Sequence, residues 1–208
     1  MNWLMNAGIG YLLGSIPSGV LVGRVATGRD VREYGSGKTG FTNTLRSAGI
    51  GAALIVITVD IAKGALPVII GRFVFDDPWA VAVGAVAAVA GHNWPLFAGF
   101  RGGRGVATSF GAFVAMAPPA ALGVLVLGMA LLAATRYVSL TSMAATAAGF
   151  VAILALVIAG QLPAPYLLFA VAAGTAVEFS HLDNARRLLA GTEPKLGHGG
   201  VRRNGLQS

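Results

Sequence analysis

The stretch GSGKTGFTNTLR, residues 35–46, combines glycines with hydroxyl, amide and basic side chains, which is the chemistry of an anion site. Its G-x-G-x-x-G spacing is typical of nucleotide loops, but those follow a strand and open a helix within a βαβ unit. Here the stretch follows an apolar run and the polar segment ATGRDVREY, and Arg32 occupies the position where a Walker A loop needs glycine. We therefore reject a nucleotide site. Glycine-rich turns present successive backbone N–H groups to an anion, and a guanidinium matches a phosphate.

The side chains of this stretch that could hold a phosphate are Ser36, Lys38, Thr42, Asn43 and Arg46. We predict that these residues lie in a glycine-rich loop, which taken alone is more consistent with a flexible, solvated connector than with a site. A second stretch, RGGRG, comes just before an apolar run, where a helix N-terminus would also favour an anion. It holds Arg101, Gly102, Gly103 and Arg104. For Arg101, an ordinary positive anchor at the membrane surface is an equal alternative.

Two later polar segments have the spacing of a shared helix face. Ser139 and Ser142 are three residues apart, as are His181 and Asn184. Serines in helices commonly bond back to their own backbone, so the first pair is ambiguous. His181 is a general base, a hydrogen-bond donor or a plain surface histidine. Glu193 could pair with an arginine and hold the C-terminal segment in place.

Three ionisable residues fall within or at the ends of apolar runs. Asp60 and Lys63 are separated by three positions, so that they could pair on one helix face. Ionisable groups at membrane depth are costly and suggest function by default. A structural ion pair is at least as consistent with this spacing as a ligand contact. We interpret His92 as a buried histidine or a hydrogen-bonding group at a helix end.

The elements that must position these residues are membrane helices. Of the 208 residues, 55% are hydrophobic and 11% are charged, whereas soluble domains carry about 25% charged residues. The chain contains no cysteine, which excludes a disulfide framework and a thiolate nucleophile or metal ligand. The net charge of +7 is interspersed between apolar runs, which indicates membrane topology and an anionic ligand instead of a nucleic acid.

The apolar runs predict an all-α, polytopic membrane helix bundle that forms a single domain over residues 1–208. The predicted spans are 3–23, 50–70, 79–98, two within 106–135, 139–159 and 163–179. The run 106–135 is too long for one crossing, and Pro118-Pro119 should bend it into a short hairpin. With two crossings there, every basic residue except Lys63 and Arg72 lies on one side, Arg202 and Arg203 included; with one crossing, the charges divide evenly. The positive-inside rule therefore favours seven spans, an outside N-terminus and a cytoplasmic C-terminus.

Four motifs in this order resemble those of the bacterial acyl-phosphate:glycerol-3-phosphate acyltransferase family, over nearly the whole chain. They are GSIPSG (14–19), GSGKTGFTNTLR (35–46), GHNWPLFAGFRGGRGVATSFG (91–111) and HLDNARRLLAGTEPKL (181–196). The resemblance implies transfer of a fatty acyl group from acyl phosphate to the 1-hydroxyl of glycerol 3-phosphate. Lysophosphatidic acid and phosphate would be the products, at the first step of phospholipid synthesis. It also implies seven spans in the bacterial cytoplasmic (inner) membrane, a site facing the cytoplasm, and no metal, cofactor or acyl-CoA.

By this resemblance, Ser36, Arg46, His181 and Asn184 match the family's essential residues, and Glu193 a structural glutamate. Arg104 stands where the family usually has lysine, in the glycine-rich motif linked to glycerol phosphate. A serine of SLTS contacts substrate in the family, and we favour Ser142 over Ser139. Lys38 and Phe41 depart from a usual asparagine and alanine, and RGGRG replaces KGGKG.

Acyl phosphate is already activated, so the site needs chiefly to bind two phosphates and to place the hydroxyl near the carbonyl. The hydroxyl proton could pass to His181 or to the substrate phosphate; we favour the phosphate, because no carboxylate is evident to orient a histidine base. The chain lacks both the H-x-x-x-x-D pair and the G-x-S-x-G elbow. The competing hypothesis is a transporter or channel for an organic phosphate anion, which should show inverted repeats. We expect a monomer.

Overall fold

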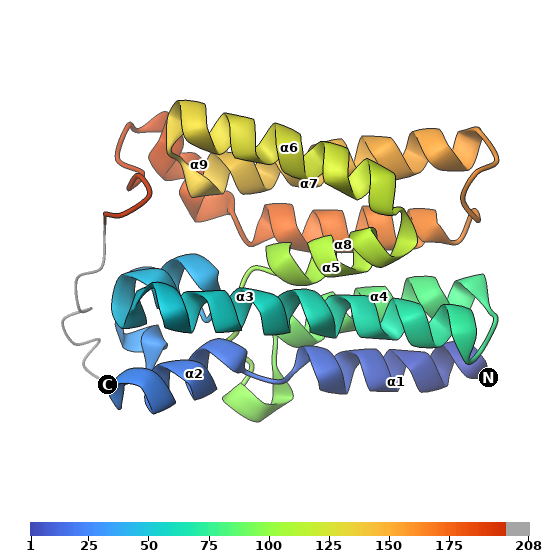
Figure 1. Ribbon diagram of the computed structural model, residues 1–208, viewed down its shortest axis with the longest axis horizontal. Coiled ribbons are helices and arrows are strands. Elements are labelled where there is room, and N and C mark those ends of the chain that lie inside the picture. The colour runs from blue at the N-terminus through green and yellow to red at the C-terminus, as the bar shows by residue number, and fades with distance from the viewer. Residues whose placement is uncertain (199–208) are drawn as a thin grey trace.

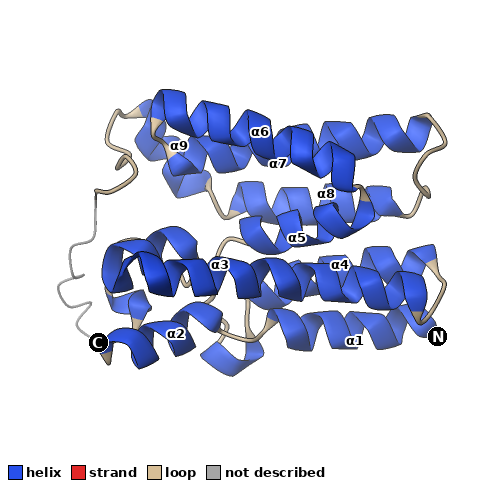
Figure 2. Ribbon diagram, viewed as in Figure 1, coloured by secondary structure: helices blue, strands red, loops and turns tan. Residues whose placement is uncertain are grey.

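The computed structural model describes residues 1–198, and every element of two or more residues over that range is a helix, which confirms the predicted all-α class (Figure 2). The predicted tail residues Arg202 and Arg203 lie outside the described range. The helices are α1 (Asn2–Gly14), α2 (Ser18–Thr27), η1 (Val31–Glu33), α3 (Phe41–Phe73), α4 (Pro78–Asn93), η2 (Leu96–Ala98), α5 (Val106–Met116), α6 (Pro118–Thr135), α7 (Val138–Ile158), α8 (Tyr166–Phe179) and α9 (Leu182–Leu189).

The long helices run side by side along the longest axis of the molecule (Figure 1). α1 to α4 form one group, α6 to α8 form a second, and the short α5 lies between them. α4 also contacts α8, so the two groups share a common core. The N-terminus lies at one end of the bundle, whereas α2, α9 and the α6–α7 turn lie at the other.

The run 106–135 forms the predicted hairpin. α5 ends at Met116, Ala117 makes the turn, and Pro118 starts α6 at a position where its missing N–H costs nothing. α5 has 11 residues, so it is only about 16 Å long, roughly half of a bilayer's hydrocarbon thickness. Among residues 1–198, five apolar stretches are long enough to cross a membrane, while α5 and α8 are shorter.

Two helical regions differ from the predictions: the first predicted span is interrupted, and α3 begins earlier than expected and is broken at Gly49. The first predicted span is two helices, because Pro17 caps α2 after a turn at Ser15. α3 begins at Phe41 and contains Gly49 with a φ of 84° and a ψ of 176°, which separates its first turns from the rest. Thr42, Asn43 and Arg46 therefore lie on a helix, and their assignment to a glycine-rich loop is wrong.

Small residues bring α1 and α4 into close contact, as the abundance of glycine and alanine predicts. A Cβ added at Gly10 would collide with the backbone of Gly84, and one added at Gly14 would collide with Ala88. The two backbones thus approach too closely for larger side chains at these positions.

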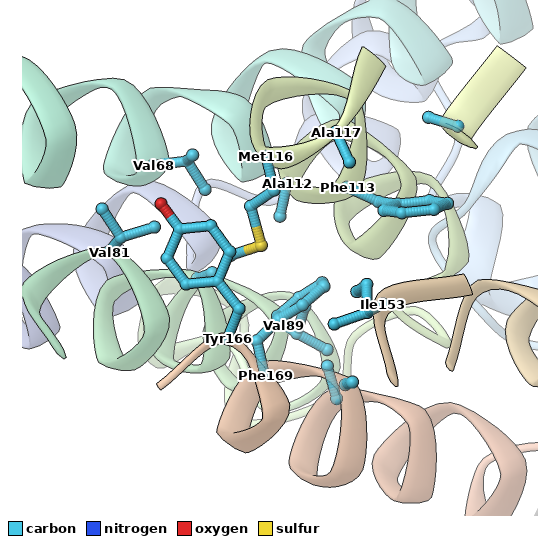
Figure 3. Close-up of a cluster of buried hydrophobic side chains, with 14 residues drawn as sticks. Val68, Val81, Val89, Ala112, Phe113, Met116, Ala117, Ile153, Tyr166 and Phe169 are labelled. Atoms are coloured by element: carbon cyan, nitrogen blue, oxygen red, sulfur yellow. The ribbon is translucent and has the colours of Figure 1, made fainter. Parts of the chain in front are cut away.

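The apolar core lies where α3, α4, α5, α7 and α8 meet (Figure 3). Val89, Met116, Tyr166 and Phe169 are almost fully buried there. Arg72 closes this region near the N-terminal end, because its Nη2 donates to the carbonyl of Met116 at 3.3 Å and to the hydroxyl of Tyr166 at 3.4 Å. The core fixes the helices that carry the polar residues at the opposite end.

Candidate functional site

The predicted polar segments come together at the end of the bundle that carries α2 and α9 (Figure 1). We call the residues gathered there the polar cluster. Its members are Lys38, Arg46, Arg104, Ser139, His181, Asn184, Arg187 and Glu193. Ser36 lies two residues before Lys38 in the same loop. The members come from all four polar segments, which confirms that these segments converge on one region.

The first segment is organised by a buried amide. Asn43 donates through Nδ2 to the carbonyls of Val31 (2.7 Å) and Lys38 (2.8 Å), and its Oδ1 accepts the backbone N–H of Ser36 at 3.1 Å. Its amide group is therefore engaged in shaping the loop that leads into α3. Asn43 supports Ser36 and Lys38, both of which remain partly exposed.

Arg46 lies one turn further along α3 and is partly buried. Its Nε is buried without a hydrogen-bond partner. A buried guanidinium donor that the protein leaves unsatisfied is costly unless a ligand accepts from it. Thr42, on the preceding turn, is also partly exposed.

The glycine pair of the second segment packs directly on His92. The N–H of Gly103 donates to the carbonyl of His92 at 3.0 Å. A Cβ on Gly103 would collide with the His92 ring, and one on Gly102 with its carbonyl. The protein itself therefore requires glycine at both positions. Arg101 is exposed, so its guanidinium is accessible to a ligand as well as to the membrane surface.

Arg104 follows this pair and reaches the last segment. Its Nε donates to the carbonyl of Ser180 at 3.2 Å. Burial lowers the pKa of Arg104, and the neighbouring charges of Arg187 and Arg46 lower it further. Three guanidinium groups from three segments are thus close enough to repel one another, which favours an anion between them.

Glu193 is the carboxylate that holds this region together. Its Oε1 accepts from Ser139 Oγ at 2.7 Å and from Asn184 Nδ2 at 2.6 Å, while Oε2 accepts from Arg187 Nε at 2.7 Å. Burial raises the pKa of Glu193, but the hydrogen bonds from Asn184, Ser139 and Arg187 outweigh it and bring the pKa below its ordinary value. The predicted pairing of Glu193 with an arginine is confirmed. The Oδ1 of Asn184 is buried without a partner.

His181 is buried at the N-cap of α9, and its Nδ1 lies 2.8 Å from the carbonyl of Val177. Since a carbonyl only accepts, Nδ1 carries the proton and Nε2 has a free lone pair. Burial lowers the pKa of His181 to about 4, and the charge of Arg104 acts in the same direction. The imidazole is therefore neutral near pH 7 and a weak base.

The two serines of α7 differ in their partners. Ser139 donates to Glu193, whereas the Oγ of Ser142 donates to the carbonyl of Val138 in its own helix at 2.8 Å. Ser139 is therefore engaged in supporting the site. Ser142 keeps its hydroxyl lone pairs for another donor, because its proton alone is used by the backbone.

Sequence reasoning missed Asn93. It is 5% exposed, its Nδ2 lies 3.4 Å from Ser180 Oγ, and its Oδ1 is buried without a partner. Ser180 also accepts from Arg104 through its carbonyl, so Asn93 adjoins the polar cluster. A polar side chain immediately after His92 in GHNWP was the available signal. Within residues 1–198, no three acidic, histidine or cysteine side chains gather as a metal site.

A cation-rich polar cluster at one end of a bundle with five bilayer-length apolar stretches defines a class: an integral membrane protein that binds a phosphate-bearing ligand. The sequence model of the family described as glycerol-3-phosphate acyltransferase matches residues 4–191. The chain belongs to this family, which confirms the resemblance of its motifs, and it is a multi-pass integral membrane enzyme, a glycerol-3-phosphate acyltransferase.

Individual proteins that are similar to this chain support its membership of the family. A glycerol-3-phosphate acyltransferase of Rubrobacter xylanophilus is 48% identical over 189 residues, covering 91% of this chain and 92% of the relative. One from Synechococcus sp. (strain JA-3-3Ab) is 51% identical over 191 residues, with 90% of each chain covered. The crystal structure of PlsY (YgiH), an integral membrane glycerol 3-phosphate acyltransferase, in its glycerol 3-phosphate form, superposes with a TM-score of 0.86 at 36% identity, over 95% of this chain and 96% of that one. Its lysophosphatidic acid form gives a TM-score of 0.82.

Proposed function

We propose that this enzyme transfers a fatty acyl group from acyl phosphate to the 1-hydroxyl of glycerol 3-phosphate, yielding lysophosphatidic acid and phosphate. The observation that carries the proposal is the meeting of Arg46, Arg104 and Arg187 around a single buried carboxylate, which is already engaged by three donors. The excess positive charge suits two phosphorylated reactants. The glycerol 3-phosphate and lysophosphatidic acid forms of the related PlsY structure support the same acceptor and product.

The substrate phosphates lie between the backbone N–H groups of the first loop and the guanidinium groups that flank it. The proposed binding residues are Lys38, Thr42, Asn43, Arg101, Gly102, Gly103, Arg104, Ser139 and Ser142. Arg46 and Ser36 hold the phosphate at the reacting centre, because the buried Nε of Arg46 has no acceptor within the described residues and a phosphate oxygen would supply one. Gly102, Gly103, Asn43 and Ser139 act indirectly, since their contacts within the protein shape the site.

The chemical step is a direct acyl transfer. The 1-hydroxyl oxygen forms a bond to the acyl carbon, the bond from that carbon to the phosphate oxygen breaks, and phosphate leaves. The hydroxyl proton passes to phosphate, whose second pKa is about 6. His181 accepts a hydrogen bond from the hydroxyl through Nε2 and orients it; its pKa of about 4 makes it a weak general base. The free Oδ1 of Asn184 accepts from the other glycerol hydroxyl.

The acyl chain lies in an apolar groove between α4 and α8. This groove has a volume of about 410 Å³. Its lining includes Val89, Ala90, Trp94, Ala176 and Phe179. Trp94 follows Asn93, and Phe179 precedes Ser180, so the groove extends from the edge of the polar cluster along the membrane helices.

The proposed topology has seven crossings, with the N-terminus outside and the C-terminus and polar cluster in the cytoplasm of a bacterium. α5 and α8 are its two shorter crossings. The concentration of basic residues at the polar end supports this orientation. The chain acts as a monomer and one domain in the inner membrane, at the first step of phospholipid synthesis, without a metal or other cofactor.

The test is an assay of purified protein in bilayers with radiolabelled glycerol 3-phosphate. We expect lysophosphatidate with acyl phosphate and none with acyl-CoA. Formation of product only with acyl-CoA would overturn the donor assignment. Vesicle uptake of glycerol 3-phosphate without product from either donor would instead support an organic phosphate carrier.

A further inference from the structure

A buried ionic cluster lies outside the polar cluster, within α3. Asp60 and Lys63 are 1% and 3% exposed. The Oδ1 atom of Asp60 accepts from Lys63 Nζ at 2.8 Å and from Ser18 Oγ at 2.6 Å, and His92 Nδ1 lies 3.6 Å away. One carboxylate oxygen thus contacts the first residue of α2, the body of α3 and the end of α4. Burying such charges is costly, so a purely apolar contact would have stabilised the bundle at least as well.

The contact with Ser18 leads to the first loop. Ser18 starts α2 directly after the break that follows α1, and Lys63 Nζ donates to the carbonyl of Ile16 within that break at 3.1 Å. The next residue, Gly19, packs so closely on the carbonyl of Thr39 that a Cβ would collide with it. Asp60 therefore fixes the helix start against which the loop of residues 35–40 rests.

The contact with His92 leads to the second loop. His92 is 4% exposed, its carbonyl accepts the N–H of Gly103, and its ring fills the space beside Gly103. Gly103 directly precedes Arg104. The orientation of the His92 ring, which faces Asp60 through Nδ1, thereby fixes the path of the backbone into Arg104.

We propose that Asp60 is a positioning residue that couples the two anion-binding loops, by fixing Ser18 beneath the first and His92 beneath the second. The proposal rests on the acyl transfer proposed above. Because both loops rest on groups that contact one carboxylate, their relative position is fixed. Replacement of Asp60 therefore weakens the binding of both substrates, although the Asp60 side chain contacts neither of them.

The test replaces the charged pair by an apolar one, Asp60→Leu/Lys63→Met, since replacement of a whole buried ion pair avoids leaving one charge unpaired. The melting temperature in detergent is measured with and without inorganic phosphate, and kcat and KM are measured for both substrates. We expect a folded protein with a smaller phosphate-induced rise in melting temperature. Its kcat/KM should fall by about tenfold to a hundredfold, with a higher KM for each substrate.

Arg72→Gln is the matched control, because it removes a partly buried charged side chain at the opposite end of the bundle. It should lower the melting temperature and leave both KM values unchanged. Wild-type kcat/KM and phosphate response in the folded double variant would overturn the proposal. Should the double variant not fold, Ser18→Ala and His92→Gln decide: raised KM values support the coupling, and wild-type values in both exclude it. A wild-type protein that responds to phosphate without acyl transfer would contradict the proposed reaction and not the coupling.

Discussion

Asn184 and Glu193 are joined by a 2.6 Å hydrogen bond from Nδ2 to Oε1, which closes the segment after α9 back onto that helix. The same oxygen accepts from Ser139 on α7. The bond uses the donor end of the Asn184 amide and leaves the acceptor end, Oδ1, buried and available. Glu193 therefore orients Asn184 toward a ligand that carries a hydroxyl or another donor.

Glu193→Gln should remove one of the three hydrogen bonds that this carboxylate accepts and keep the other two. The amide oxygen can still accept from Ser139 and Asn184, but the amide nitrogen cannot accept from Arg187. We expect a lower melting temperature and a fall in kcat/KM of about tenfold to a hundredfold, as for lost hydrogen bonds to charged groups. Arg186→Gln, which breaks the exposed pair with Asp183, is the control and should change neither quantity. Equal effects of the two variants in thermal melts and initial rates would contradict this role.

Arg46→Ala should abolish turnover while the protein still inserts and folds. Removing a preorganised donor to developing negative charge costs on the order of a hundredfold to a thousandfold in kcat. Asn184→Ala should have a comparable effect, because the free Oδ1 is lost. The check is a rate assay on protein whose melting curve is intact. Arg24→Ala, at an exposed arginine, should retain activity; wild-type rates in either site variant would remove that residue from the reaction.

Arg104→Lys separates charge from geometry. Lysine keeps the positive charge but lacks the guanidinium fork, and so it loses the bond from Nε to the carbonyl of Ser180. We expect the KM for glycerol 3-phosphate to rise severalfold with kcat largely preserved, whereas Arg104→Ala should be inactive. Steady-state kinetics distinguish these outcomes. If lysine were as damaging as alanine, the bond to Ser180 and not the charge would be the essential feature.

The neutral state of His181 predicts a pH-dependent stability. Its pKa falls from 6.5 to about 4 on folding. Between these two pH values, the imidazole is therefore protonated in the unfolded chain and neutral in the folded protein. The contribution of His181 to the stability of the native state is therefore fully present above pH 6.5 and is lost progressively as the pH falls from 6.5 towards 4. The difference in apparent melting temperature between wild type and His181→Asn measures this contribution. A difference that stays constant over this pH range would exclude the lowered pKa.

Filling the groove between α4 and α8 should change the preference for acyl chain length. Ala176→Leu adds bulk within its lining, and we expect a larger loss of kcat/KM with palmitoyl phosphate than with octanoyl phosphate. The matched control is Ala26→Leu, which fills the apolar groove between α2 and α3. A length-dependent loss in the control alone would place the acyl chain in that other groove.

The sequence predicted the helical class, the hairpin at Pro118 and the convergence of the polar segments, since each follows from local composition or from charge balance. It did not reveal the break after α1. The freed carbonyl of Ile16 is satisfied by Lys63, and no local pattern announces a partner so distant in the chain. By contrast, the excess of positive charge in the polar cluster could be predicted from the number of basic residues in the polar segments.

It was harder to predict which residues of the site contact a ligand and which ones support the structure around it. Helical spacing placed Ser139 and Ser142 on one face but could not decide which of them meets Glu193. The amide of Asn43 was interpreted as a substrate ligand, whereas its bonds to Val31 and Lys38 depend on the fold of the loop. Such roles are set by tertiary contacts that residue types alone do not determine.

The shortness of α5 has a consequence for the surrounding lipid. A helix of 11 residues cannot span an undisturbed bilayer by itself, but none of its residues is exposed, so neighbouring helices and not lipid surround it. The bilayer therefore need not thin around this helix, and Arg104, which lies just before its start, is held in place by the helices that pack around α5.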